Sequence, residues 1–236
     1  MWGNNEIGSI NDIEALSSLC QKNNTLFHTD ATQVLGKIPI DLKKCLVNFL
    51  SCSAHKLHGP KGIGACFIRK TKLGLKTKLT PLLHGGSQEN GYRAGTLAVH
   101  NIVGFGKACV IARHDINKNV KHLHDLEKKL IYQLKEKLPL IEFNQPAEQK
   151  IPGIISITIP GINNELLVNH LAKSGFAVST GSACSASEPS HVLTAIGATL
   201  LKSRSTIRIS LDKYSTEQQL TKFSIQLENI CNSLMF

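Results

Sequence analysis

The sequence lacks any apolar run long enough to cross a membrane. A spanning helix needs about 18 to 20 consecutive apolar residues, and every apolar run in the 236 residues is shorter. The first residues, Met-Trp-Gly-Asn-Asn-Glu, also lack the basic stretch and apolar core of a secretory signal, and they lack an Arg- and Ser-rich transit pattern. These absences predict a soluble chain in the cytoplasm, without a membrane partner.

Paired cysteines are absent as well. The seven cysteines are an odd number, scattered along the chain without a Cys-x-x-Cys pair. This pattern argues against both a disulfide framework and a zinc site. We therefore expect reduced thiols, most of them buried as small apolar residues, and no metal ion.

Basic residues outnumber acidic ones by 27 to 17, which gives a formal net charge of +10. Such a charge can neutralise nucleic-acid phosphates, but the lysines are dispersed, and no stacking-aromatic motif accompanies them. The dense run over residues 118–137 alternates with acidic residues, as solvated helix faces do. The sequence therefore favours a plain basic surface over direct nucleic-acid binding, with attraction of an anionic ligand or an acidic partner as the alternative.

The first half of the chain alternates between helical and strand patterns. Apolar spacing predicts a helix over residues 10–22, and short apolar runs predict strands over residues 25–29, 47–53 and 64–69. The first two of these strands lead into polar residues, Asp30 and the stretch Ser-Ala-His-Lys. This order predicts an open α/β sheet whose ligand site lies along one edge.

The second half is predicted to form a smaller α+β domain. Residues 99–138 have the pattern of one long amphipathic helix or two, and residues 139–152 form a polar, proline-bounded connection. Three further strands are expected over residues 154–159, 176–179 and 207–210, and three helices over residues 164–174, 190–196 and 216–234.

Lys56 follows the second expected strand and precedes a glycine-rich turn. An exposed lysine is usually a solvated surface residue. The alternative is a Schiff-base lysine, which requires a partly desolvated amine near a bound aldehyde. Asp30 favours the second interpretation, because a pyridinium cofactor needs a carboxylate to keep its ring nitrogen protonated. Gln33 and Asn5 add polar groups expected at the same edge.

Cys184 lies in the stretch Thr-Gly-Ser-Ala-Cys-Ser-Ala-Ser. A lone cysteine between small residues is usually a buried space-filler. Small and polar residues are also typical of a solvated loop, in which a thiolate can travel between a substrate sulfur and an outside acceptor. Cys184 is therefore the candidate nucleophile among the cysteines.

Eight stretches, in order along the chain, resemble the cysteine desulfurases of the NifS/IscS type, which belong to the class-V aminotransferases. They are residues 4–8 (NNEIG), 28–33 (HTDATQ), 53–56 (SAHK), 59–64 (GPKGIG), 93–96 (RAGT), 180–184 (TGSAC), 188–193 (EPSHVL) and 207–210 (IRIS). The resemblance implies the α/β fold type I of transferases that depend on pyridoxal 5'-phosphate (PLP), and a homodimer. It makes residues 1–115 the C-terminal part of the large PLP-binding domain, and residues 116–236 the small α+β domain that carries the catalytic cysteine loop.

The resemblance also assigns a residue to each group of the cofactor. Lys56 is the lysine that forms the Schiff base with PLP. Asp30 pairs with the pyridine nitrogen, and Gln33 bonds the phenolic oxygen. Ser53 and His55 bind the phosphate.

For the substrate, the resemblance implies that Asn5 contacts the substrate-carboxylate side of the cofactor and that Arg208 clamps the carboxylate. A planar guanidinium suits this task because it can form two parallel charge-assisted hydrogen bonds. Thr96 reaches the phosphate in the partner subunit. Cys184 takes the sulfur as a persulfide, and alanine is released.

The activity implied is desulfuration of L-cysteine for iron-sulfur cluster biosynthesis or tRNA thiolation, with a scaffold protein or a tRNA-thiolation enzyme as sulfur acceptor. Two alternatives stay open: a selenocysteine lyase, which shares the lysine, aspartate and cysteine, and a non-catalytic remnant that serves as an association module. The family's Gly-Thr phosphate turn and its ring-stacking histidine lie ahead of the NNEIG motif and have no match here. Only three residues separate Cys184 from Glu188, a shorter loop than in scaffold-feeding members.

Overall fold

The computed structural model describes residues 1–70, 74, 77, 79–145, 149–181 and 190–234. The chain divides into two compact units, one made of residues 1–3 and 11–116, the other of residues 4–10 and 117–236. Helix α2 (Val99–Lys137) gives its N-terminal part to the first unit and its C-terminal part to the second.

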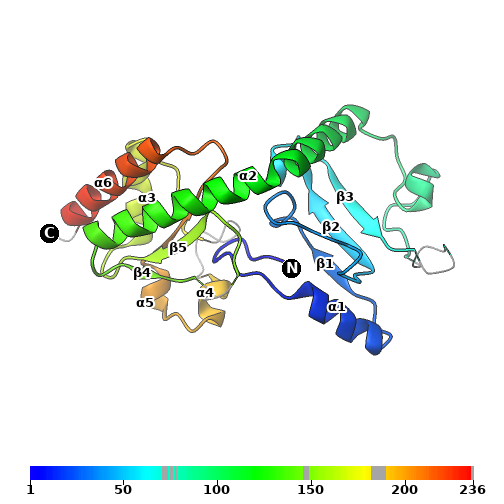
Figure 1. Ribbon diagram of the computed structural model, residues 1–236, viewed down its shortest axis with the longest axis horizontal. Coiled ribbons are helices and arrows are strands. Elements are labelled where there is room, and N and C mark those ends of the chain that lie inside the picture. Colours follow the sequence, from blue (N-terminus) through cyan, green and yellow to red (C-terminus); the bar gives the residue numbers. More distant parts are fainter. Residues whose placement is uncertain (71–73, 75–76, 78, 146–148, 182–189, 235–236) are drawn as a thin grey trace. The chain divides into compact units, whose positions relative to one another are not determined.

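The first unit is built on a three-stranded sheet in the order β1-β2-β3 (Figure 1). Strand β1 (His28–Asp30) runs parallel to β2 (Phe49–Ser53), and β2 pairs antiparallel with β3 (Gly64–Ile68). The 3-10 helix η1 (Ala54–Leu57) follows β2 without a break. Because β1 and β2 are parallel, the residues at their carboxyl ends lie at the same edge of the sheet.

Helix α1 (Ile13–Lys22) begins where the sequence supplies a cap, because the Asp12 carboxylate accepts a hydrogen bond from the Ala15 N–H at 2.9 Å. Strand β1 starts later than the predicted residue 25. The side chain of Asn48 accepts the Phe27 N–H at 2.9 Å, so a side-chain amide binds this backbone group in place of a neighbouring strand.

The core of the first unit joins η1 to the N-terminal part of α2. Ala54 and Leu57 pack against Phe105 and Ala108 of the helix. An ideal Cβ on Gly59 would lie 3.0 Å from the Ala54 Cβ and 3.3 Å from the Cβ of Ala108 in α2, so glycine favours this close approach. The turn after η1 is therefore held tightly against the helix. A second 3-10 segment, η2 (Gln88–Gly91), precedes α2 in the chain.

The second unit contains an antiparallel sheet in the order β4-β5-β6. Strand β4 (Glu142–Phe143) is short, and every residue of the central strand β5 (Ile154–Thr158) is buried. Strand β6 (Thr206–Ser210) pairs along the whole of β5, with Arg208 opposite Ser156. The helices of this unit are α3 (Asn164–Lys173), α4 (His191–Ala195), α5 (Leu200–Ser203) and α6 (Glu217–Leu234).

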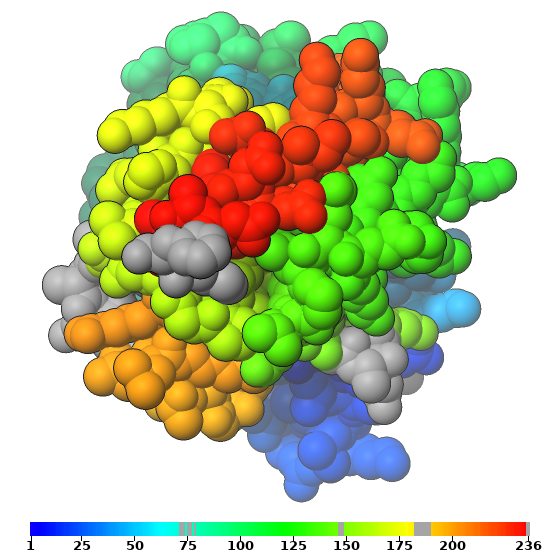
Figure 2. All heavy atoms as spheres, turned by 90° about the vertical axis from the view of Figure 1, so that its left-hand side faces the viewer, coloured from blue at the N-terminus to red at the C-terminus, as the bar shows by residue number. Residues whose placement is uncertain are grey.

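Leucines spaced four residues apart bring the C-terminal part of α2 onto the core of the second unit. Leu126, Leu130 and Leu134 are all at most 5% exposed, and burial of each such side chain contributes roughly 1.5 to 3 kcal/mol. Figure 2 shows α6 (red) between α3 (yellow) and this part of α2 (green). At the rim of this core, an ion pair of 2.8 Å between Lys137 and Glu228 joins α2 to α6.

Most predicted elements form with ends within a few residues of the expected ones, and residues 99–137 form one helix. The strand predicted over residues 176–179 was wrong. Only Ser179 pairs there, through two hydrogen bonds with Arg208 of 2.6 and 3.1 Å, while Phe176 and Val178 pack onto the core without a ladder. The connection predicted over residues 139–152 contains β4.

Candidate active site

Asp30 and Lys56 lie at the same edge of the first sheet. Asp30 ends β1 and pairs in register with Ser51 of the parallel strand β2, which continues to Ser53 and into η1, where Lys56 lies. The Asp30 carboxylate accepts the Thr32 N–H at 2.8 Å, which fixes its orientation. Lys56 is exposed, and its amine makes no hydrogen bond or ion pair with another described residue.

Ser53 and His55 are joined directly at this edge. The Ser53 Oγ lies 2.8 Å from Nδ1 of His55, so the hydroxyl orients the exposed imidazole ring. A second hydroxyl–imidazole pair links the strands themselves, because Oγ of Ser51 lies 3.1 Å from Nε2 of His28. Ser53 and His55 precede Lys56 in the chain by three residues and one residue. Their hydroxyl and imidazole groups can therefore bind an anionic group at the same sheet edge.

Gln33 lies in the turn that follows β1. The turn is held in place by Ala31 and Val34, which are both fully buried. The Gln33 Oε1 accepts a hydrogen bond from the Lys37 ammonium at 3.4 Å. The amide N–H groups of Gln33 are then the donors for its predicted hydrogen bond to the phenolic oxygen of the cofactor.

Thr96 is exposed in the segment between η2 and α2. The neighbouring backbone is fixed by polar contacts, since the Gly95 N–H donates to Oε1 of Gln88 at 3.0 Å and Arg93 donates to the Gly95 carbonyl at 3.2 Å. Gly95 has a φ of +106°, a backbone conformation that favours glycine. Thr96 therefore lies on a surface loop whose neighbouring backbone is held by hydrogen bonds.

In the second unit the structure brings Asn5 and Arg208 together. Nη1 of Arg208 donates to the backbone carbonyl of Asn5 at 2.9 Å, so Asn5 contributes its main chain to this contact. Burial lowers the pKa of the Arg208 guanidinium, and the nearby Glu6 carboxylate raises it in part. Among the described residues, Nε of Arg208 has no hydrogen-bond partner although it is buried. A partly desolvated guanidinium with a free donor is suited to bind a carboxylate.

Sequence reasoning missed Glu6, which is only 4% exposed in the second unit. Its carboxylate accepts a hydrogen bond from the Ser190 Oγ at 2.5 Å. Acidic residues are mostly exposed, so a single glutamate in a short turn gave no sign of burial. The position of Glu6 inside the NNEIG stretch was the signal available.

Cys184, the predicted nucleophile, lies outside the described residues. The other six cysteines are free thiols. Cys45 and Cys231 are buried, Cys20, Cys52 and Cys109 are partly buried, and Cys66 is exposed, so the expectation that most of the cysteines are buried was wrong for the described ones. In the described part of the chain, no group of three or more His, Cys, Asp or Glu side chains is arranged to hold a metal ion. Nor does any helix in that part combine the length and apolarity needed to cross a bilayer.

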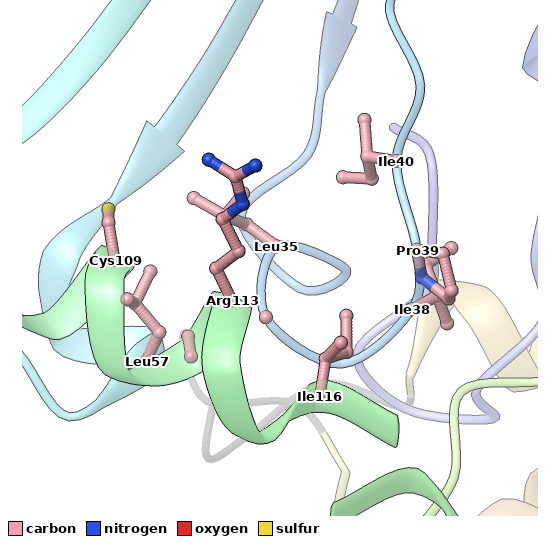
Figure 3. A pocket seen from close by; sticks show the side chains of 10 residues that line it. Leu35, Ile38, Pro39, Ile40, Leu57, Cys109, Arg113 and Ile116 are labelled. Carbon is pink, nitrogen blue, oxygen red and sulfur yellow. The ribbon is translucent and has the colours of Figure 1, made fainter.

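An apolar pocket of about 280 Å³ lies elsewhere in the first unit (Figure 3). Residues after β1, such as Leu35 and Ile40, form one side of it, and Cys109 and Ile116 of α2 form another. The predicted site residues do not line it. Arg113 is the one charged side chain of its lining, and the lining has no lysine for an aldehyde and no carboxylate for a pyridine nitrogen, so the sheet edge remains the better candidate.

The residues at the sheet edge fit PLP. The cofactor needs a free amine for its aldehyde and a carboxylate for its ring nitrogen, and Lys56 and Asp30 provide them at the ends of neighbouring parallel strands. Ser53 and His55 add the hydroxyl and imidazole groups that a phosphate requires.

Comparison with known proteins agrees with this arrangement. The chain is 41% identical over 236 residues to the cysteine desulfurase IscS of Dictyoglomus turgidum, covering 99% of this chain and 59% of that protein. It superposes on a solved NifS-like protein with a TM-score of 0.88 at 38% identity, over 98% of this chain and 60% of the other. A structure described as SspA in complex with cysteine is 32% identical, with a TM-score of 0.68, over 91% of this chain and 58% of that one.

The chain thus spans about 59% of the length of the relative from D. turgidum. The match to NifS-like structures confirms the predicted α/β fold type I. The aminotransferase class-V family model matches residues 1–223, and cysteine desulfurases of this family depend on PLP. The chain therefore belongs to the class-V aminotransferase family.

Proposed function

We propose that this chain acts in a PLP-dependent cysteine desulfurase, which moves sulfur from L-cysteine to Cys184 and releases L-alanine. The observation that carries the proposal is the placement of Lys56 and Asp30 at the carboxyl ends of adjacent parallel strands. The relative named cysteine desulfurase IscS and the SspA structure with cysteine support the choice of substrate.

The residues of the sheet edge hold the cofactor in this proposal. Lys56 binds its aldehyde through Nζ, Asp30 keeps the pyridine nitrogen protonated, and the amide of Gln33 donates to the phenolic oxygen. Ser53 and His55 bind the phosphate. When bound, PLP supplies an electron-withdrawing ring that stabilises negative charge at the substrate α-carbon.

Three side chains act on the substrate. Arg208 binds the carboxylate of cysteine, with Asn5 on the same side of the site. The Lys56 amine, which the substrate amine would displace from the cofactor aldehyde, removes the proton from the α-carbon and later returns it. The Cys184 thiolate attacks the substrate sulfur, so that an S–S bond forms while the C–S bond breaks. The electron pair of the broken bond stays with carbon, which takes up a proton to give alanine, and the sulfur remains on Cys184 as a persulfide.

The proposal extends to partners. The enzyme works as a cytoplasmic homodimer in which Thr96 of one subunit reaches the phosphate bound by the other. The persulfide sulfur passes to a scaffold protein for iron-sulfur clusters or to a tRNA-thiolation enzyme. Relative turnover of cysteine and selenocysteine tests the substrate choice, and a strong preference for selenocysteine would overturn it.

Replacement of Lys56 tests the cofactor assignment. Lys56→Ala is expected to abolish the absorbance band of lysine-bound PLP, because Lys56 is the amine assigned to this linkage at the β1–β2 edge. Lys61→Ala, which removes another exposed lysine five residues further along, is the matched control and should keep the band. After borohydride reduction, mass spectrometry should find the cofactor on Lys56, and a band retained by Lys56→Ala would contradict the assignment.

A further inference from the structure

The apolar pocket of the first unit has the size of a small-molecule site. Its volume is about 280 Å³, close to the lower end of the range for such sites, roughly 300 to 1,000 Å³. A cavity of about 150 Å³ lined by leucine, isoleucine and phenylalanine is large enough to bind benzene, with its six carbon atoms. By the same proportion, this pocket has room for an apolar chain on the order of ten carbon atoms.

Most of the pocket wall comes from two segments of the first unit (Figure 3). Leu35, Ile38 and Ile40 belong to the segment that follows β1, and Ile116 belongs to α2. Each of these side chains is only partly buried. They therefore present apolar surface to a ligand, and removal of that surface from water favours binding of an apolar group.

Arg113 gives the pocket a single positive charge. It is exposed, and among the described residues its guanidinium makes no hydrogen bond or ion pair. Figure 3 shows its side chain extending away from α2, with the guanidinium at the end farthest from the helix. A guanidinium binds a carboxylate through two parallel charge-assisted hydrogen bonds. A ligand whose carboxylate binds Arg113 can therefore place an apolar tail against the pocket walls.

We propose that the pocket binds a monocarboxylate whose apolar tail has on the order of ten carbon atoms, in chemical terms a medium-chain fatty acid. Its carboxylate binds the Arg113 guanidinium, and its tail lies against Leu35 and Ile116. The site is separate from the proposed function, because none of the assigned cofactor or substrate residues lines it. It borders the sheet edge through η1, in which Leu57 lines the pocket and directly follows Lys56.

Tail length tests whether the ligand occupies a pocket of limited size. Sodium hexanoate, octanoate, decanoate and tetradecanoate are titrated into the 236-residue protein by calorimetry, below the concentrations at which they form micelles. Each added methylene group should tighten binding about fourfold. The gain should stop near ten carbon atoms, because the pocket is then full. Affinity that still rises at tetradecanoate would indicate adsorption on apolar surface, and it would overturn the proposal, as would absence of decanoate binding.

Arg113→Met tests the carboxylate contact, because it removes the charge and keeps most of the apolar stem. Loss of a charge-assisted hydrogen bond should weaken decanoate binding about tenfold, whereas binding of the uncharged decanol should not change. Lys107→Met is the matched control, since Lys107 is an exposed cation on the same helix that does not line the pocket. Equal losses in the two variants would mean a general attraction of anions to a basic chain, and that result, or no loss in Arg113→Met, would refute the contact.

Cys109 reports occupancy of the pocket without any substitution. Its partly buried thiol lines the pocket, and burial raises its pKa. Alkylation by iodoacetamide at pH 9 is followed by peptide mass spectrometry, with the exposed Cys66 of β3 as the internal reference. Decanoate at about ten times its Kd leaves about one tenth of the pockets free, so alkylation of Cys109 should slow about tenfold and that of Cys66 should stay the same.

Two outcomes of this experiment would overturn the proposal. Unslowed alkylation of Cys109 at saturating decanoate would place the ligand elsewhere on the protein. A Cys109 rate that falls as the protein concentration rises, in the absence of decanoate, would assign the pocket to contacts between copies of this chain instead.

Discussion

Lys150 and Glu127 form an ion pair in the second unit whose side chains are only 12% and 8% exposed. Each partner has a further contact, because Glu127 accepts the Gly153 N–H at 2.9 Å and Lys150 donates to the Ile154 carbonyl at 2.9 Å. Burial lowers the pKa of Lys150, while the Glu127 carboxylate acts in the opposite direction. The pair therefore fastens the segment before β5 to α2.

Removal of one partner should leave an uncompensated buried charge. We expect Lys150→Met to lower the free energy of unfolding by about 3 kcal/mol. Lys129→Met is the matched control, since Lys129 pairs with Glu217 at 50% and 60% exposure, and exposed pairs contribute at most about 1 kcal/mol. Urea denaturation measures both variants, and equal losses would show that burial of the Lys150 pair has no special effect.

The described thiols should differ sharply in reactivity. Burial raises the pKa of Cys231 to about 12, whereas Cys66 is exposed on β3. Because the thiolate is the nucleophile, we expect iodoacetamide at pH 9 to label Cys66 and to spare Cys231 in the folded protein. Peptide mass spectrometry checks this, and rapid labelling of Cys231 without unfolding would contradict it.

The same shift in Cys231 makes stability depend on pH with a defined sign. In the folded protein the pKa of the Cys231 thiol is about 12, above the ordinary value of 9.0. Below pH 9 the thiol therefore keeps its proton in both the folded and the unfolded protein. Between these two values the unfolded thiol ionises and the folded one does not, and stability falls as pH rises. For one such group the slope approaches about 1.4 kcal/mol per pH unit.

The sequence predicted those parts of the fold that depend on local pattern. The amphipathic pattern over residues 99–138 predicted α2 as one helix or two, and Asp30 and Lys56 were expected at one sheet edge because each follows a short apolar strand. The strand expected over residues 176–179 failed because its apolar residues face the core while only Ser179 pairs with a neighbouring strand, and no local pattern reports such pairing. Burial of Glu6 depends on Ser190, which lies 184 residues away in the chain.

Arg208→Lys tests the carboxylate clamp. A lysine replaces the two-pronged guanidinium with a point charge, so we expect kcat/KM for cysteine to fall about tenfold or more, mainly through KM. Arg204→Lys is the control, because Arg204 is exposed and precedes β6. The melting temperatures of both variants are compared with that of the original protein. Similar values verify that the contact of Arg208 with Asn5 is not needed for folding. An unchanged kcat/KM in Arg208→Lys would refute the clamp.

Cys184→Ala separates sulfur transfer from cofactor binding. If Cys184 carries the persulfide, its replacement should abolish sulfide production from cysteine while the absorbance of lysine-bound PLP persists. Cys66→Ala removes the exposed thiol on β3 and should leave sulfide production intact. Sulfide release by Cys184→Ala at an undiminished rate would assign the sulfur to another acceptor.

Cofactor affinity is the property in which the 236 residues by themselves should differ most from a longer relative. In the described part of the chain, β1 and β3 are the edges of the first sheet and each pairs on one side only, and open edges favour association with other strands. The chain spans 59% of the D. turgidum desulfurase, and no histidine here matches the one that stacks on the pyridine ring in the family. We therefore expect the 236-residue protein to bind PLP at least about a hundredfold more weakly than that relative, since about 2.7 kcal/mol of stacking and phosphate contacts is missing. It should also associate in solution. An absorbance titration against Lys56→Ala subtracts the reaction of PLP with surface lysines, and light scattering follows association. Equal affinity in the two proteins would mean that the residues at the β1–β2 edge suffice to hold the cofactor.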